Sequence, residues 1–277
     1  MGRLDGKVAF ITGAARGQGR SHAVTLAREG ADIVAVDINR QIESVPYAMA
    51  APEDLAETAR QVEDLDRRIV TREADVRDYG RLEAVVDEGL SEFGHIDIIC
   101  ANAGIGSFEP AWEMTKDTWE DMIDTNLSGV WYTVRAALPS MVERGQGGSI
   151  IITSSIYGVK GPPGNLVHYA AAKHGVVGIM RNLANELAPH WIRVNTVNPT
   201  FVATDMVQNE TVYEMFLPES SNPTREEFMA LLTEMNSLPI PWVEVNDISN
   251  AVLWLASDES RYVTGTTMLV DAGTTAK

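Results

Sequence analysis

Short apolar runs alternate with longer segments of helical periodicity along almost the whole chain. The first two runs, 8–12 and 33–36, flank a helical segment at 19–29. Because these runs are apolar at every position, rather than at every second one, they are typical of a parallel sheet covered on both faces. The alternation predicts right-handed β-α-β units, and therefore an α/β, single-domain doubly wound Rossmann fold with a mainly parallel seven-stranded sheet.

The same pattern extends to the end of the sequence. Further strands are expected at 69–74, 96–100, 149–153, 193–197 and 267–270, and further helices at 53–67, 79–93, 118–144, 169–187 and 246–256. We expect the helix at 118–144 to bend near Pro139. No linker or repeat divides the chain, so one domain is expected over 1–277. Two segments break the pattern, an inserted loop at 38–52 and a stretch at 205–241 whose methionines and aromatics favour a substrate lid.

Charge and cysteine content exclude several classes of protein. The formal net charge is −17 and the basic residues are scattered, which argues against a nucleic-acid or anionic-membrane partner. The single Cys100 allows no intramolecular disulfide, and the five histidines lack metal-ligand spacing, so no metal is expected. No apolar run reaches membrane-spanning length and no signal peptide is recognisable, so a soluble cytoplasmic protein is expected.

A glycine-rich segment, ITGAARGQG, lies between the first strand and the first helix. Gly13, Gly17 and Gly19 allow a tight turn and a close approach of the backbone to a pyrophosphate. The helix that follows offers free N–H groups and the positive end of its dipole to that anion. The segment therefore predicts a dinucleotide site, with Arg16 and Gln18 among its contacts.

An aspartate, Asp37, ends the second strand about twenty residues beyond the glycine segment. A carboxylate there can accept hydrogen bonds from the adenosine ribose and would repel a 2′-phosphate, so NAD is preferred over NADP, with Ile38 beside it. Arg16 leaves the opposite preference open, because an arginine in this loop can pair with a phosphate.

The ends of the third and fourth strands supply further candidate contacts. Ligands of such sheets bind beyond the carboxyl ends of the strands. Asp75 is expected at the adenine amino group and Val76 against its ring, while the backbone of Asn102, Ala103 and Gly104 passes beneath the adenosine. For Asp75, a role as helix N-cap remains the alternative.

A tyrosine and a lysine, Tyr169 and Lys173, lie four residues apart in YAAAK. On a helix they share a face, and an ammonium near a phenol favours the phenolate, which suits proton transfer to or from an alcohol or ketone. The fifth strand brings Ser154 and Ser155 to the same edge of the sheet, where a hydroxyl can donate to a carbonyl oxygen. Asn126 lies among apolar residues of the preceding helix.

Taken in order, these motifs resemble those of the short-chain dehydrogenase/reductase family over nearly the full length. The resemblance implies a tetrad in which Tyr169 is the general acid/base, Lys173 lowers the pKa of Tyr169 and holds the nicotinamide ribose, Ser155 orients the substrate oxygen, and Asn126 supports a proton relay. It implies an NAD-dependent oxidoreductase acting on a secondary alcohol or ketone, and a homotetramer. A dehydratase or epimerase, or a nucleotide sensor without turnover, remains the alternative.

The sequence departs from the family pattern at two places. The usual thirteen-residue count back from Tyr169 reaches Ile156; we choose Ser155, with Ser154 as runner-up, because Gly158 has the expected offset from Ser155. The second departure is Asn-Pro-Thr at 198–200, where many members have Pro-Gly. Pro199 remains a candidate cofactor contact. The resemblance also implies that Val202 and Thr204 contact the nicotinamide carboxamide.

The inserted loop resembles that of a mycofactocin-associated, carveol-dehydrogenase-like subgroup. The matching residues are Asp37-Ile38, Ser44-Val45-Pro46-Tyr47 and Pro52-Glu53-Asp54-Leu55. The resemblance implies tightly held NAD and transfer of electrons to an external redox cofactor, mycofactocin. The apolar lid suggests a fairly apolar, terpenoid-like substrate. A plain surface loop or a subunit contact is the alternative for 38–52. Whether Tyr157 lines the substrate pocket is left open, and a structural role is favoured for His168.

Overall fold

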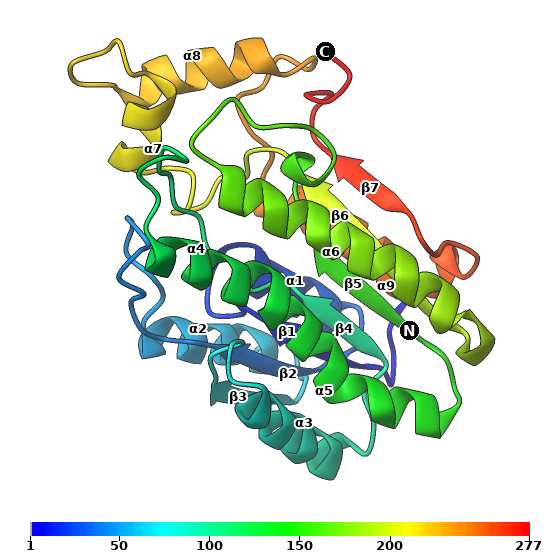
Figure 1. Cartoon of the computed structure of the whole chain (residues 1–277). Helices are drawn as coiled ribbons and strands as arrows, with labels where there is room; N and C mark the ends of the chain where they lie inside the picture. The colour runs from blue at the N-terminus through cyan, green and yellow to red at the C-terminus, as the bar shows by residue number, and fades with distance from the viewer. Residues whose placement is uncertain (1) are drawn as a thin grey trace.

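The computed structural model describes residues 2–277, and within them seven strands form one sheet (Figure 1). The strand order is β3-β2-β1-β4-β5-β6-β7, and every pairing is parallel. The strands are β1 (Val8–Thr12), β2 (Asp32–Asp37), β3 (Ile69–Glu73), β4 (Ile98–Ala101), β5 (Gly148–Thr153), β6 (Ile192–Pro199) and β7 (Thr267–Val270). The predicted doubly wound Rossmann fold is confirmed. Successive strands are added in one direction from β1 to β3 and in the other from β4 to β7. The point where this order reverses, between β1 and β4, is where such sheets bind ligands.

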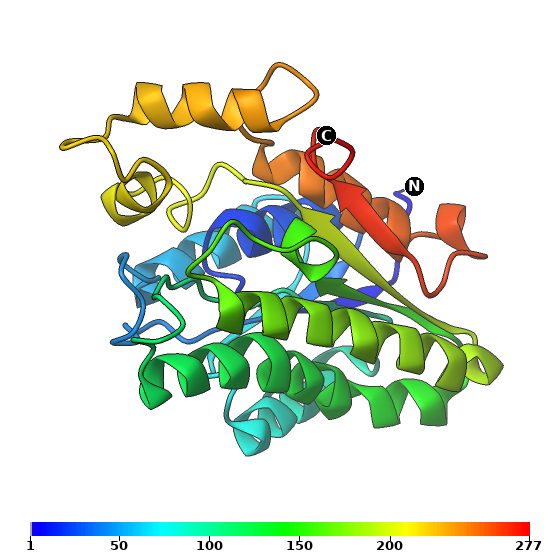
Figure 2. The ribbon, with the colours of Figure 1, turned by 45° about the horizontal axis from the view of Figure 1, so that its top comes forward.

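The helices fall into two layers, one on each face of the sheet (Figures 1 and 2). On one face lie α3 (Tyr79–Phe93), α4 (Lys116–Ile123), α5 (Gly129–Arg144) and α6 (Val167–Glu186). On the other lie α1 (Gly17–Arg28), α2 (Pro52–Glu63) and α9 (Val245–Ala256). Two further helices, α7 (Glu210–Phe216) and α8 (Arg225–Met235), stand apart beyond the carboxyl ends of the strands.

Strands β1, β2, β4, β5 and β6 each contribute to two separate cores, because successive side chains point to opposite faces. Phe10 and Ile99 pack with the α3, α5 and α6 side, whereas Ile11 and Ile98 pack with the α1 and α9 side. All five residues of β1 are buried. This explains the continuous apolar runs: a strand covered on both faces has no solvent-facing position to give to a polar residue.

The prediction of one long helix at 118–144 is wrong in one respect. In the structure, a π-helical turn, η1 (Asp124–Ser128), separates α4 from α5, and Pro139 lies inside α5. The side-chain amide of Asn126, within η1, donates to the carbonyl of Ile105 and accepts from its N–H, each at 2.8 Å. The interruption thus coincides with a tertiary contact, which a search for helix-breaking residues cannot detect.

Two other expectations need adjustment. The helix predicted at 53–67 ends at Glu63, because the chain reverses at Asp66, whose φ is 57°.

The segment 205–241 contains α7 and α8, which sequence periodicity did not predict. Thr224 caps α8 together with Glu227, and this capping box was the available signal. Both helices pack around an aromatic cluster of Phe201, Tyr213, Phe216, Phe228 and Trp242. Among residues 2–277, no helix is long and apolar enough to cross a membrane.

Candidate active site

Two adjoining cavities lie beyond the carboxyl ends of the strands. The larger, of about 420 Å³, is lined by the glycine segment, the end of β2 and the inserted loop. The smaller, of about 120 Å³, is lined by Ser155, Tyr169, Lys173 and apolar residues of the 201–216 segment. Gln18, Asn102, Gly104, Ile105, Thr204 and Met206 line both. The predicted nucleotide and chemical sites are therefore neighbours.

The glycine segment forms a backbone cradle that excludes side chains. Gly13 has a φ of 67°, in the region that favours glycine. A Cβ atom at Gly19 would lie 1.9 Å from the Gly13 carbonyl oxygen, so a side chain there would displace the turn. Helix α1 begins at Gly17, and its first residues, Gly17, Gln18 and Gly19, line this cavity. The free N–H groups of a first helical turn favour a bound anion. The cradle fits a pyrophosphate.

Asp37 lies at the cavity wall, at the end of β2. One carboxylate oxygen accepts the Ala15 N–H at 2.9 Å and the other accepts the Ile38 N–H at 2.8 Å. Burial raises the pKa of Asp37, and these backbone hydrogen bonds oppose the rise. Each oxygen keeps a second lone pair that a ribose hydroxyl can use.

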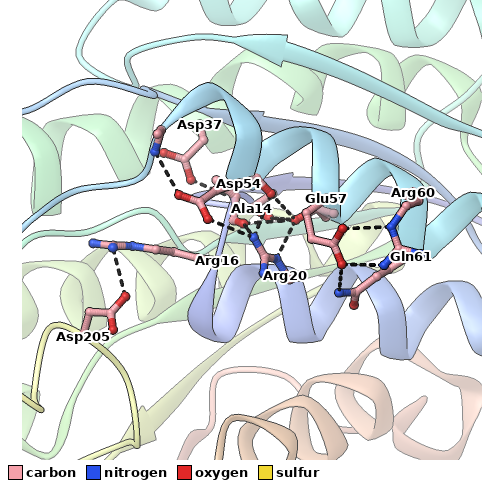
Figure 3. Close-up of polar contacts among 12 residues, drawn as sticks. Ala14, Arg16, Arg20, Asp37, Asp54, Glu57, Arg60, Gln61 and Asp205 are labelled. Atoms are coloured by element: carbon pink, nitrogen blue, oxygen red, sulfur yellow. Dashed lines mark hydrogen bonds and ion pairs between the residues drawn. The ribbon is translucent and has the colours of Figure 1, made fainter.

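Arg16 is committed to protein partners. It donates to Asp205 at 2.9 Å (Figure 3). It also donates to the carbonyl of Ala48. It therefore joins the glycine segment to the inserted loop and to the 205–241 segment. Figure 3 also shows Arg20, which lines the same cavity, turned toward Asp54. With Arg16 occupied in this way, the acidic wall at Asp37 argues for NAD over NADP.

Asp75 and Val76 line the same cavity. Burial alone would raise the pKa of Asp75, but hydrogen bonds from Arg77 and Arg40 hold it below its usual value. The N-cap of α3 is Asp78, which accepts from the Arg81 N–H, so the alternative role of Asp75 as N-cap is wrong. The adenine contact remains a prediction.

Asn102 braces the cradle with its side chain. Its amide donates to the carbonyls of Thr12 and Gly13 at 3.1 and 3.3 Å and accepts from Thr153 at 3.2 Å. It thus connects the ends of β1 and β5 across β4. The backbone of Ala103 and Gly104 lines the cavity beside it, as expected for a floor beneath a nucleotide.

The inserted loop is folded against the site. The side chain of Gln41 donates to three carbonyls of the loop and accepts the Met49 N–H, which fixes its shape. Ile42 and Val45 are buried against Ile105 and Met122. Tyr47 accepts the Gly106 N–H at 3.0 Å, and it was missed as a site residue. The available signal was an aromatic residue between Pro46 and Pro52 of the inserted loop.

The chemical groups meet at the end of β5 and on α6. Lys173 donates to the Thr153 carbonyl at 2.8 Å, and its ammonium lies 5.6 Å from the centroid of the Tyr169 ring. Ser154 donates its hydroxyl proton to the carbonyl of Lys173 at 3.0 Å, so this proton is not available to a substrate. Ser155 accepts the Tyr157 N–H at 3.1 Å, which leaves its own proton available. This geometry favours Ser155 over Ser154.

Burial dominates the protonation of this pair. It raises the pKa of Tyr169 to about 12, while the Ser155 hydroxyl acts in the opposite direction. Burial lowers the pKa of Lys173 to about 8. The lowered pKa expected for Tyr169 is therefore not found in the protein alone. The physical reason is that the same desolvation penalises the phenolate and the ammonium.

Asn126 holds the wall of the site through its side chain. Besides its two hydrogen bonds to Ile105, its amide donates to the Met122 sulfur at 3.0 Å. These contacts occupy the side chain, so Asn126 fixes the segment that follows Gly104. Its predicted part in a proton relay remains a prediction.

The end of β6 and the residues after it line the two cavities, and Thr204 lines both. Pro199, Val202 and Thr204 line the smaller one. Thr204 also approaches the position that a Cβ atom at Gly17 would occupy, at 3.3 Å. Thr200, at the unusual Asn-Pro-Thr, hydrogen-bonds Thr274 at 3.0 Å, and this contact ties the C-terminal segment to the site.

The structure shows where Tyr157 and His168 lie relative to the two cavities. Tyr157 is buried and lines the smaller cavity. His168 is fully buried and hydrogen-bonds Ser107 at 2.8 Å, and it does not line either of these two cavities, in keeping with a structural role. No group of acidic, histidine or cysteine side chains among residues 2–277 could hold a metal ion.

Comparisons with known proteins agree with this geometry. Residues 7–214 match the short chain dehydrogenase family. The chain is 51% identical to (−)-trans-carveol dehydrogenase of Rhodococcus erythropolis, with full coverage of both. It is 56% identical to the structure of carveol dehydrogenase from Mycobacterium avium in complex with NAD, with full coverage of both chains and a TM-score of 0.98. A short chain dehydrogenase from Mycobacterium paratuberculosis bound to NAD is 46% identical, with full coverage of both chains and a TM-score of 0.92.

Proposed function

The chain belongs to the short-chain dehydrogenase family and is an NAD-dependent oxidoreductase, and we propose that it interconverts an apolar secondary alcohol and its ketone. The observation that carries the proposal is the grouping of Ser155, Tyr169 and Lys173 at a small apolar cavity that adjoins the glycine cradle. An alcohol held there would have its oxygen near a proton acceptor and its carbon near the nucleotide cavity.

The cofactor fits the residues that are present. The cradle of Gly13 and Gly19 would hold the pyrophosphate, and Asp37 would hold the adenosine ribose. Lys173 and Thr204 line the cavity where the nicotinamide half would lie. Bound NAD⁺ supplies the acceptor for the hydride that leaves the alcohol carbon.

The protein's own groups handle the proton and the orientation. Ser155 would donate to the substrate oxygen, since its Oγ already accepts from the backbone and its hydroxyl lies beside the Tyr169 phenol. Tyr169, as phenolate, would take the hydroxyl proton during oxidation and return it during reduction. Lys173 stabilises that phenolate through its charge, and the Thr153 carbonyl holds the ammonium in place.

The apolar lining supports a hydrophobic substrate. Phe108, Ile156, Leu166, Phe201, Val212 and Phe216 contribute to the smaller cavity. Together with the 51% identity to a carveol dehydrogenase, this lining supports a terpenoid-like, cyclic secondary alcohol. The 205–241 segment would act as its lid, because Met206, Val212 and Phe216 form part of the cavity wall.

The inserted loop supports a second part of the proposal, that NAD is held tightly. Tyr47, Met49 and Ala50 line the nucleotide cavity, and Arg16 bonds the loop at Ala48. A loop so anchored would have to move before the nucleotide leaves. We also propose, from the sequence resemblance, that mycofactocin accepts the electrons and that the protein is a homotetramer. We propose a cytoplasmic location as well, as expected from the sequence.

Replacement of Tyr169 by phenylalanine tests the chemistry. Tyr169→Phe should lower kcat for oxidation of a cyclic secondary alcohol by about 10²- to 10⁴-fold, because the base is lost. NAD binding, measured by calorimetry, should be retained. Tyr262→Phe is the matched control, since Tyr262 is 80% exposed and lines neither of these two cavities. Near-normal turnover of Tyr169→Phe with intact NAD binding would overturn the proposed mechanism.

A further inference from the structure

We propose that Tyr157 hydrogen-bonds a second oxygen-bearing group of the substrate, so that the preferred alcohol carries another hydroxyl or carbonyl besides the one oxidised. The inference rests on the proposed alcohol–ketone activity and specifies its substrate class. It starts from a polar atom that the fold leaves unsatisfied in an otherwise apolar wall.

The hydroxyl of Tyr157 is buried and has no hydrogen-bond partner among residues 2–277. The residue as a whole is only 7% exposed. Its backbone N–H is occupied by Ser155, and its ring packs with Ile156, Leu166, Phe108 and Tyr169. The phenol is thus held by packing, while its oxygen makes no hydrogen bond within the described part of the chain.

Such an arrangement is costly unless something uses the hydroxyl. A buried hydroxyl without a partner costs about 1–3 kcal/mol, whereas a phenylalanine of the same shape would fill the space at no such cost. Other nearby hydroxyls are committed: Ser154 donates to Lys173, and Thr200 pairs with Thr274. Tyr157 therefore differs from these two hydroxyl groups in having no hydrogen-bond partner.

The surroundings indicate which partner would use it. Tyr157 lines the smaller cavity together with Ser155 and Tyr169, so a substrate bound to the pair would lie against it. Phe201, Val212 and Phe216, which also line this cavity, are apolar. Burial raises the pKa of Tyr157 and the nearby Tyr169 adds to the rise, so the phenol stays neutral. A neutral phenol suits an uncharged hydroxyl or carbonyl better than a carboxylate or an ammonium.

Matched ligand pairs and Tyr157→Phe test the inference. The protein loaded with NAD is titrated by calorimetry with cyclohexane-1,4-dione, 4-hydroxycyclohexanone and 4-methylcyclohexanone, all of which are uncharged. Turnover is then measured with the corresponding diol and methylcyclohexanol. In the wild type, at least one dioxygenated ligand should bind about tenfold more tightly than its methyl analogue. Tyr157→Phe should abolish that preference and leave the methyl analogue within about twofold.

Two results would overturn the inference. One is the absence of any preference for a dioxygenated ligand in the wild type, or its survival in Tyr157→Phe. The other is an equal loss for both ligand classes in Tyr157→Phe, which would assign the hydroxyl to the reacting oxygen instead. Tyr262→Phe controls for the substitution itself. Binding decides this inference and turnover decides the proposed function, so selective binding without any turnover would reject the activity and leave the Tyr157 contact standing.

Discussion

Lys173 holds its ammonium 5.6 Å from the centroid of the Tyr169 ring, one helical turn away on α6, and donates to the Thr153 carbonyl at 2.8 Å. The contact joins the helix that carries the base to the strand that ends beside Ser155. In the protein without cofactor, burial disfavours the charged form of both side chains. It raises the pKa of Tyr169 to about 12 and lowers the pKa of Lys173 to about 8.

The first prediction concerns the pH dependence of turnover. Oxidation needs deprotonated Tyr169, and its pKa is raised to about 12, so kcat/KM for alcohol oxidation should rise from pH 6 to pH 10. Ketone reduction needs the protonated form and should not rise over that range. A flat profile for oxidation would contradict the assignment of Tyr169 as the base.

The second prediction concerns Lys173→Met. Below pH 8 the ammonium is charged and favours the phenolate, so the variant should lose at least about tenfold in oxidation at pH 7. The difference in oxidation rate between the wild type and the variant should decrease above about pH 8, because Lys173 then loses its own proton in the wild type. A difference that stays constant across this range would indicate a purely structural role. Steady-state rates at several pH values measure it.

The third prediction concerns cofactor choice. Asp37→Asn keeps a hydrogen-bond acceptor but removes the charge that would repel a 2′-phosphate. The ratio of kcat/KM for NADP to that for NAD should rise by about ten- to a hundredfold. Asp87→Asn, at an exposed position of α3, should leave the ratio unchanged. An unaltered ratio in Asp37→Asn would show that Asp37 does not face the ribose.

The fourth prediction concerns the glycine cradle. Gly19→Ala would place a Cβ atom 1.9 Å from the Gly13 carbonyl oxygen and should weaken NAD binding by about ten- to a hundredfold. Gly178→Ala on α6 is the control, since a Cβ atom there meets nothing within 4 Å. Calorimetric titration with NAD distinguishes them. Equal affinity in the two variants would reject the cradle as the pyrophosphate site.

The fifth prediction concerns the closure of the inserted loop. Asp205→Asn removes one partner of Arg16, which also bonds Ala48 of the loop. Because Asp205 is exposed, the gain in the NADH dissociation rate should be only about two- to fivefold. Stopped-flow fluorescence measures this rate, with Asp87→Asn as the charge-matched control. If the rate does not change, the ion pair plays no part in holding the cofactor.

The chemistry of this protein is largely local in the sequence. The cradle of Gly13, Gly17 and Gly19 is a single turn between a strand and a helix, and Tyr169 and Lys173 share a face through helical spacing. Both follow from short-range geometry, and the strand pattern follows from burial on two faces. The fold class and the grouping of candidate site residues were therefore predictable from the sequence alone.

Only the tertiary structure decided which groups are free and which are occupied. Arg16 meets Asp205 across 189 residues of chain, and Tyr47 meets Gly106 across 59. Ser154 and Ser155 are adjacent and chemically identical, yet the first is bonded to the Lys173 carbonyl and the second is not. The interruption of the long helix at Asn126 has the same origin. Periodicity and propensity describe near neighbours along the chain, whereas these contacts depend on where distant segments pack.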